Sequence, residues 1–224
     1  RILNKGKEWG KVRENPLSQI KMFRLEERKP RFLSEEEFSR LMQCACEPLK
    51  PILVIAALTG MRRGEILNLT WKDINFDIGL INVEHTKTSK AREIPLADTV
   101  RDLLWNLKKT SNSEYVFADK NGNPYSYAVR FWFDKAVRDS GTKDCSFHTL
   151  RHTFASNLVK CNINLKVIQE LLGHSNLSVT MKYAHLSPGL KQQAIQMLDT
   201  EIGLVKKWLK KGVSPASLKV NSLK

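Results

Sequence analysis

Residues 79–96 restrict the fold of this 224-residue chain more than any other stretch, because their apolar pattern has the period of a β-strand. Two short apolar segments, 80–83 and 93–96, flank the polar, lysine-containing turn 85–90. Such a pair of segments around a polar turn is typical of a β-hairpin. Most other apolar residues recur at helical spacing. The pattern therefore predicts a mainly α fold with a small antiparallel β-sheet, an α+β protein.

Helices are predicted on both sides of this hairpin. Ser34 begins the motif S-E-E-E, a capping box expected to start a helix over residues 35–46. A buried helix is expected to begin at Pro51 and to end at Thr59-Gly60, and a short strand is expected at 115–117. Further helices are expected at 61–69, 100–107, 125–139, 148–160, 164–172, 177–184, 188–198 and 201–211, and residues 1–14 are interpreted as the end of a basic helix.

The net charge of +14 is concentrated at the two ends of the chain. Residues 1–31 contain ten lysines and arginines against four acidic residues, and residues 201–224 contain six against one. Residues 32–200 are nearly balanced, with 21 basic against 18 acidic residues. Basic ends on a balanced centre indicate a nucleic-acid partner contacted through its phosphates, and solubility alone is the plainer alternative.

Cysteine usage and hydropathy restrict the class of protein. The four cysteines form no C-x-x-C pair and are expected to be reduced thiols. Cys145, His148 and His152 have the spacing C-x2-H-x3-H, but no second cysteine pair accompanies them and Arg151 would place a cation beside the metal. No apolar run reaches the roughly 20 residues that span a bilayer, and no signal-peptide core opens the chain. We therefore predict no metal site, no membrane partner and a cytoplasmic location.

A segment from residue 147 to residue 186 gathers the side chains that phosphodiester chemistry requires. Guanidinium groups bind phosphate, imidazoles transfer protons, and a tyrosine hydroxyl is a nucleophile. Each residue alone has a plainer interpretation, because hydrogen-bonded core histidines outnumber catalytic ones and a tyrosine on an amphipathic helix usually packs. The candidates are His148, Arg151, His152, His174 and Tyr183.

Two basic features outside this segment could also contact phosphates. Arg62 and Arg63 directly follow a glycine-ended helix and open the next one, where cations and amides can meet an anion. The hairpin tip carries Lys87 and Lys90, with Arg92 just beyond, and could reach into a DNA groove. An exposed basic turn is the plainer interpretation of each feature.

Five motifs stand in a fixed order along the chain: T-G-M-R at 59–62, T-K-T-S-K-A-R-E-I-P-L at 86–96, H-T-L-R-H at 148–152, L-G-H at 172–174, and Tyr183. Their order and spacing closely resemble those of the tyrosine recombinases, also called the phage integrase family. The resemblance covers about residues 32–198. It implies the tyrosine recombinase catalytic-domain fold for residues 32–200. Residues 1–31 would be the end of an upstream DNA-binding (core-binding) domain with its linker, and 201–224 a basic C-terminal helix and tail.

The resemblance implies a role for each motif residue. Arg62 and Arg151 match the two arginines that clamp the scissile phosphate, and Tyr183 matches the nucleophile. Lys87 matches the hairpin lysine, the general acid for the departing 5′-oxygen. His148 matches the first histidine of the H-x-x-R-H motif. The remaining matches are His174 at the position held by His or Trp, and Glu65 and His152 as supporting residues.

The hairpin departs from the family pattern, since it reads T-K-T where many members have G-K-G. This departure leaves two candidates, Lys87 and Lys90, for the lysine that reaches the phosphate. The register from Arg92 and Pro95-Leu96 favours Lys87.

The implied reaction is coherent as chemistry. A phosphodiester under attack gains negative charge, which guanidinium groups stabilise. Tyr183, with a free pKa of about 10, must lose its proton, and His148 is a nearby imidazole. A covalent 3′-phosphotyrosine conserves the energy of the bond, so that a 5′-hydroxyl of a partner strand can reverse the step. Nothing in the sequence supplies the paired carboxylates of a two-metal nuclease, so we predict no cofactor and no ATP.

The sequence thus predicts a site-specific recombinase, an integrase of a phage or mobile element. It would act on double-stranded DNA as a homotetramer on paired sites and be a monomer without DNA. Two alternatives are a type IB topoisomerase-like enzyme, which relaxes DNA without sequence preference, and a non-catalytic DNA-binding module that kept the fold.

Overall fold

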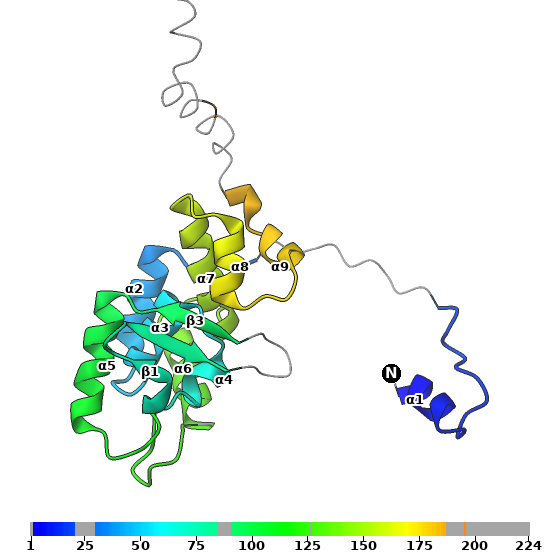
Figure 1. Cartoon of the computed structure of the whole chain (residues 1–224), viewed down its shortest axis with the longest axis horizontal. Coiled ribbons are helices and arrows are strands. Elements are labelled where there is room, and N and C mark those ends of the chain that lie inside the picture. The colour runs from blue at the N-terminus through cyan, green and yellow to red at the C-terminus, as the bar shows by residue number, and fades with distance from the viewer. Residues whose placement is uncertain (1, 21–29, 85–90, 126, 187–194, 196–224) are drawn as a thin grey trace, which may run out of the picture.

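The computed structural model of the chain, shown in Figure 1, describes residues 2–20, 30–84, 91–125, 127–186 and 195. Helices over these residues are α1 (Ile2–Glu8), α2 (Glu35–Cys44), α3 (Lys50–Thr59), α4 (Arg63–Leu67), α5 (Asp98–Thr110), α6 (Tyr127–Asp139), α7 (Phe147–Lys160), α8 (Leu165–Leu172) and α9 (Leu177–Met181). The strands are β1 (Ile74–Asn75), β2 (Leu80–Val83) and β3 (Arg92–Pro95), and single 3₁₀ turns lie at Trp71–Asp73 (η1) and Ala184–Leu186 (η2). The predicted α+β class is confirmed.

The described strands form one antiparallel sheet in the order β1-β2-β3. The predicted hairpin is confirmed, because Leu80 pairs with Pro95 and Val83 pairs with Arg92. Ile81 is buried, as alternation along β2 requires. The predicted hairpin tip, residues 85–90, lies outside the described residues.

The chain enters this body through a short anchored segment before α2. Ser34 and Glu37 form the predicted capping box, and the Glu37 carboxylate also pairs with Arg31. Beside them, the Leu33 N–H donates to the Thr153 hydroxyl on α7 at 2.9 Å. These polar contacts hold the start of α2 against α7, in addition to any apolar packing between them.

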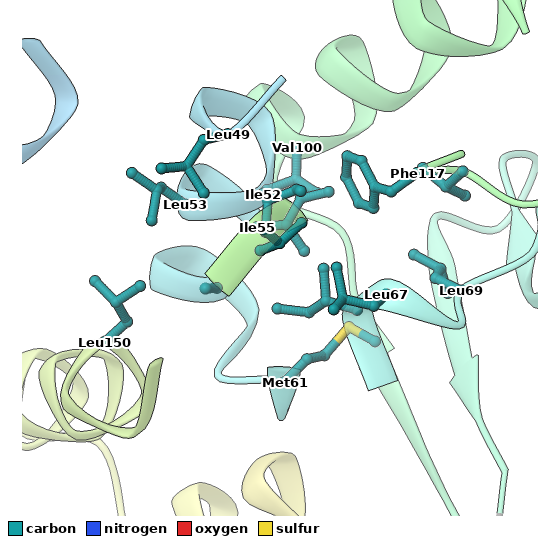
Figure 2. Packing of buried hydrophobic residues seen from close by; sticks show 14 of the residues in the cluster. Leu49, Ile52, Leu53, Ile55, Met61, Leu67, Leu69, Val100, Phe117 and Leu150 are labelled. Atoms are coloured by element: carbon teal, nitrogen blue, oxygen red, sulfur yellow. The ribbon is translucent and has the colours of Figure 1, made fainter. Parts of the chain in front are cut away.

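The hydrophobic core surrounds α3, which packs on α7, α4 and α5 (Figure 2). Ile52, Leu53 and Ile55 of α3 are fully buried, as is Leu150 of α7. Burial of one such side chain contributes about 1.5–3 kcal/mol to folding. A smaller second cluster joins α7 and α8 to the segment after α9, and Tyr183 is one of its members. The core therefore holds α7 on one side and leaves its other side to the candidate site.

Four element predictions were too long by three or more residues, or of the wrong kind. The strand expected at 115–117 is only an isolated bridge between Thr70 and Tyr115, because the chain soon turns back at Asp119–Gly122. The helix expected at 61–69 is limited to α4, since Arg62 is extended and Asn68 leaves the helical conformation. The two other differences are helices that end early, at Glu8 instead of residue 14 and at Met181 instead of residue 184.

The helices predicted at 188–198 and 201–211 lie outside the described residues. Cysteines 44, 46, 145 and 161 are free thiols. Within the described part of the chain, no helix is both long enough and apolar enough to cross a membrane.

Candidate active site

The candidate active site is a hollow between the start of α4, one face of α7, the end of α8 and the segment after α9. Helices α7, α8 and α9 lie together in the upper part of the main body in Figure 1. The hollow is lined by Arg62, His148, Arg151, His152, His174, Ser175, Val179, Lys182 and Tyr183. Four segments of sequence thus bring two arginines, three imidazoles and one tyrosine to the same place.

A glycine at the end of α3 shapes one wall of this hollow. Gly60 has a left-handed backbone (φ 63°), which terminates α3 and turns the chain toward Arg62. A Cβ at this position would lie 2.4 Å from the Phe154 ring, so only glycine fits. The Gly60 carbonyl accepts a hydrogen bond from Arg151 Nη1 at 2.6 Å. The same residue therefore ends a helix, packs on the core and holds a site arginine.

Arg62 is positioned by the carboxylate of Glu65, the third residue of α4. Glu65 accepts hydrogen bonds from the Arg62 backbone N–H at 2.8 Å and from Arg62 Nη1 at 2.9 Å. Burial alone would raise the pKa of Glu65, but hydrogen bonds from Arg92 and Arg62 outweigh it and lower the pKa to about 2. Glu65 is therefore ionised at any physiological pH, and the Arg62 guanidinium, 26% exposed, is held at the rim of the hollow.

Arg92 was expected to contact DNA, and the structure places its side chain inside the protein. Its side chain is only 5% exposed and makes a two-pronged ion pair with Glu65 at 2.7 and 3.2 Å. Its Nε donates to the Leu171 carbonyl at 2.8 Å, which ties β3 to the end of α8. Arg92 is buried because Glu65 and a carbonyl satisfy its charge and donors inside the protein.

Arg151 projects from α7 beneath the hollow and is 5% exposed. Nη1 donates to the Gly60 carbonyl, and Nη2 donates to the Leu172 carbonyl at the end of α8. Burial, followed by the charges of Arg62 and Arg92, lowers the pKa of Arg151 to about 9. The group therefore remains cationic at neutral pH. A desolvated cation beside a second arginine is an arrangement suited to binding an anion.

Tyr183 closes the hollow from the segment between α9 and η2. It is 2% exposed, and its hydroxyl lies 2.5 Å from Nδ1 of His152. The sequence-based expectation placed His148 beside this hydroxyl. The two histidines are one helical turn apart, and their ring centroids are 6.4 Å apart. The structure therefore brings the supporting histidine, His152, to the tyrosine, while His148 is exposed on the rim.

Burial keeps two imidazoles and the tyrosine of the hollow in their neutral forms at neutral pH. Burial lowers the pKa of His174 to about 4 and also lowers the pKa of His152 below its ordinary value. Burial raises the pKa of Tyr183 to about 12, against the opposing effect of Arg151. At neutral pH the site thus holds His152 and His174 as neutral imidazoles and Tyr183 as a protonated hydroxyl, beside the buried positive charge of Arg151.

One predicted DNA-contacting residue lies beside this hollow. Arg63 is exposed at the start of α4, in a second hollow that shares Arg62 and His148 with the first. This position is compatible with the predicted DNA contact. Lys87 and Lys90 lie outside the described residues.

Sequence reasoning missed three contributors to the site. Lys182 lines the hollow next to Tyr183, and its place beside the candidate nucleophile was the available signal. Thr180 is fully buried and lies 3.0 Å from Nδ1 of His174. The carbonyls that hold Arg151 are backbone groups, which no side-chain motif reveals.

Comparisons with known proteins identify the family and the fold. A model of the phage integrase family matches residues 31–190. A tyrosine recombinase of Thermosipho africanus is 35% identical over 196 residues, which cover 84% of this chain and 69% of the relative. The catalytic domain of bacteriophage HP1 integrase superposes with a TM-score of 0.60 at 29% identity, covering 76% of this chain and 96% of that domain.

A third match is a structure of a lambda integrase dimer bound to a COC′ core site. It superposes with a TM-score of 0.65 at 25% identity, and the match covers 80% of this chain and 55% of that one. Among curated relatives, the matched share of the relative's length runs from 54% to 69% in the first few. The present chain therefore corresponds to one part of such proteins.

Proposed function

This chain belongs to the phage integrase family, and from that premise we propose that it is the catalytic part of a site-specific tyrosine recombinase. It cuts and rejoins double-stranded DNA through a 3′-phosphotyrosyl intermediate, with strand exchange, in the integration or excision of a phage or mobile element. One observation carries the proposal: Tyr183 lines the same hollow as two arginines, and one of them, Arg151, is a buried cation.

The proposed steps assign one task to each group. Arg62 and Arg151 bind the scissile phosphate and stabilise the charge that develops on it. Tyr183 attacks phosphorus, and Lys87 protonates the departing 5′-oxygen. His148 and His174 donate hydrogen bonds to the phosphate oxygens from the rim. Glu65 keeps Arg62 in place, while Arg63 and Lys90 contact the DNA backbone on either side.

The proposed organisation follows the family. Residues 1–31 are the end of an upstream DNA-binding domain and its linker, 32–200 the catalytic domain, and 201–224 a basic C-terminal helix and tail. The lambda integrase match supports duplex DNA as the partner, since that protein is a dimer on its core site. We propose a monomer in the absence of DNA, a homotetramer on paired sites, and action in the cytoplasm without metal or ATP.

Covalent trapping tests the assignment of the nucleophile. Nicked suicide duplexes taken from the DNA that flanks the gene should form a denaturant-resistant complex with the unmodified protein. Tyr183→Phe should abolish this complex and leave DNA binding within about twofold, because the change removes one hydroxyl. The matched control is Tyr127→Phe, since Tyr127 is 90% exposed on α6.

The outcomes separate the three functions considered. Trapping that persists in Tyr183→Phe refutes the nucleophile. A protein that binds these duplexes and never reacts is a DNA-binding module. Relaxation of plasmids that lack any flanking sequence indicates a topoisomerase-like activity instead.

A further inference from the structure

We propose that His152 is the catalytic base of this site: its Nδ1 takes the proton of the Tyr183 hydroxyl during attack and returns it when the step reverses. The inference rests on the proposed function and deepens it, because the motif pattern assigns proton transfer to the other histidine of α7, His148.

The first argument is contact. His152 Nδ1 and the Tyr183 hydroxyl oxygen are 2.5 Å apart, in direct hydrogen-bond contact. The ring centroids of His152 and Tyr183 lie 5.9 Å apart. The ring centroids of His148 and His152, both on α7, lie 6.4 Å apart. His152 thus stands next to the tyrosine, with His148 one helical turn nearer the N-terminus of α7.

The second argument is exposure. Tyr183 is buried, His152 is half-buried, and His148 is exposed where the two hollows meet. A base that accepts the proton of a buried hydroxyl must itself extend into the same buried region. His148 is placed instead where a DNA phosphate arriving from solvent would first meet it.

The third argument is protonation state. Burial lowers the pKa of His152 below 6.5, so the ring is neutral at pH 7 and can accept at Nδ1 when its proton is on Nε2. Tyr183, with a pKa of about 12, ionises by itself in only about one molecule in 10⁵ at pH 7. At pH 7 the Tyr183 hydroxyl therefore carries the proton that is to be removed, and the neutral His152 ring is able to accept it. The charged or titratable groups that face His152 are His148, Arg151, His174, Lys182 and Tyr183.

The difference between the two pKa values decides the timing. The proton stays on Tyr183 until its oxygen begins to bond to phosphorus, because full transfer in the resting site is strongly unfavourable. In the step, the O–H bond breaks toward His152 and a P–O bond forms from the same oxygen. The P–O5′ bond breaks, and its electron pair leaves on the 5′-oxygen, which takes a proton from Lys87. Arg151 faces the developing phenolate charge and lowers its cost.

The test measures the single-turnover rate of covalent complex formation on the nicked suicide duplexes as a function of pH. For the unmodified protein we expect the rate to rise as His152 deprotonates below pH 6.5 and then to level off. His152→Gln retains a hydrogen-bonding side chain but cannot accept a proton. We expect a loss of about 10²–10³-fold at pH 7 and a rate that keeps rising with pH, because solvent must then take the proton.

Two further variants keep the test decisive. His148→Gln should slow the reaction while retaining the level region of the profile. Added imidazole should restore part of the rate to His152→Ala, which a purely structural loss would not allow.

Three results have distinct meanings. A His152→Gln protein with an unchanged profile and rate overturns the inference. Loss of the level region in His148→Gln, with His152→Gln unaffected, assigns the base to His148. An unmodified protein that forms no covalent complex at any pH instead overturns the proposed function itself.

Discussion

At the scale of single residues, one carboxylate organises the positive charge of the site. Glu65 is 6% exposed and binds both Arg62 and Arg92, whose side chains come from different elements. Arg92 is as deeply buried as Glu65, so neither charge has water to replace its partner. Removing one member of such a pair leaves a buried, unpaired charge, which is far more costly than loss of a surface pair.

Glu65→Gln should destabilise the protein by about 3 kcal/mol at pH 7, because Arg92 would remain buried without a counter-charge. Urea unfolding measures the change. The pKa of Glu65 is lowered from 4.5 to about 2, so its stabilisation is complete above pH 4.5 and disappears as the pH falls toward 2. The difference between the two proteins should shrink over that range.

The matched control is Glu170→Gln. Glu170 forms an exposed pair with Lys166 on α8, with side chains 64% and 63% exposed. Its replacement should change stability by less than about 0.5 kcal/mol. Equal stability of Glu65→Gln and the unmodified protein at pH 7 would refute the role given to the Glu65 carboxylate.

At the scale of elements, the end of α8 meets both buried arginines. Leu171 accepts from Arg92, Leu172 accepts from Arg151, and Gly173 ends the helix in a left-handed conformation (φ 65°). A Cβ on Gly173 would lie 3.0 Å from the Arg92 side chain. The end of α8 thus packs closely on Arg92 at Gly173, where there is no side chain to hold the two apart.

Gly173→Ala should therefore cost more than backbone strain alone. The control is Gly141→Ala just after α6, where φ is also 65° and nothing lies within 4 Å of the new Cβ. We expect Gly141→Ala to cost about 1 kcal/mol and to leave trapping unchanged. Gly173→Ala should be less stable than that and should slow covalent trapping as Arg92 and Arg151 shift. Equal effects on both measurements would show that the contact with Arg92 is unimportant.

The features that the sequence predicted correctly are those formed by residues close together along the chain. The capping box at Ser34 and the hairpin partners of β2 follow from neighbouring residues, and both are confirmed. Strand β1 has two residues, too few to show alternation. The burial of Arg92 depends on Glu65, 27 positions away, and the contact of His152 with Tyr183 spans 31 positions. Motifs identified these side chains, but only the packing of α4, α7 and α8 determines which of them touch.

At the scale of the whole molecule, most of the net positive charge lies outside residues 32–200, where basic and acidic residues nearly balance. Ten basic residues precede residue 32 and six follow residue 200, so phosphate contacts beyond the hollow are expected from the ends of the chain. Such contacts supply affinity without sequence preference and depend steeply on salt.

Replacing Lys206, Lys207, Lys210 and Lys211 by glutamine should weaken binding to duplex DNA at low salt. The slope of log K against log salt concentration should decrease in magnitude by about 0.9 for each lysine that contacts a phosphate. Filter binding or fluorescence anisotropy over a salt series measures it. Lys109→Gln is the control, because α5 lies at the edge of the body away from α8 and α9 in Figure 1. An unaltered slope in the fourfold variant would contradict a role for this segment in DNA binding.

Gly60 also has a consequence for engineering. In a laboratory search for variants that accept a new target sequence, substitutions at Gly60 would give proteins that are both misfolded and inactive. The Gly60 carbonyl binds Arg151, and the absence of a Gly60 side chain makes room for Phe154. A mutational library gains nothing from varying this position. Positions on the exposed face of α6 are better ones to vary. Tyr127 and Phe131 are 90% and 64% exposed there, so changing them does not disturb the core.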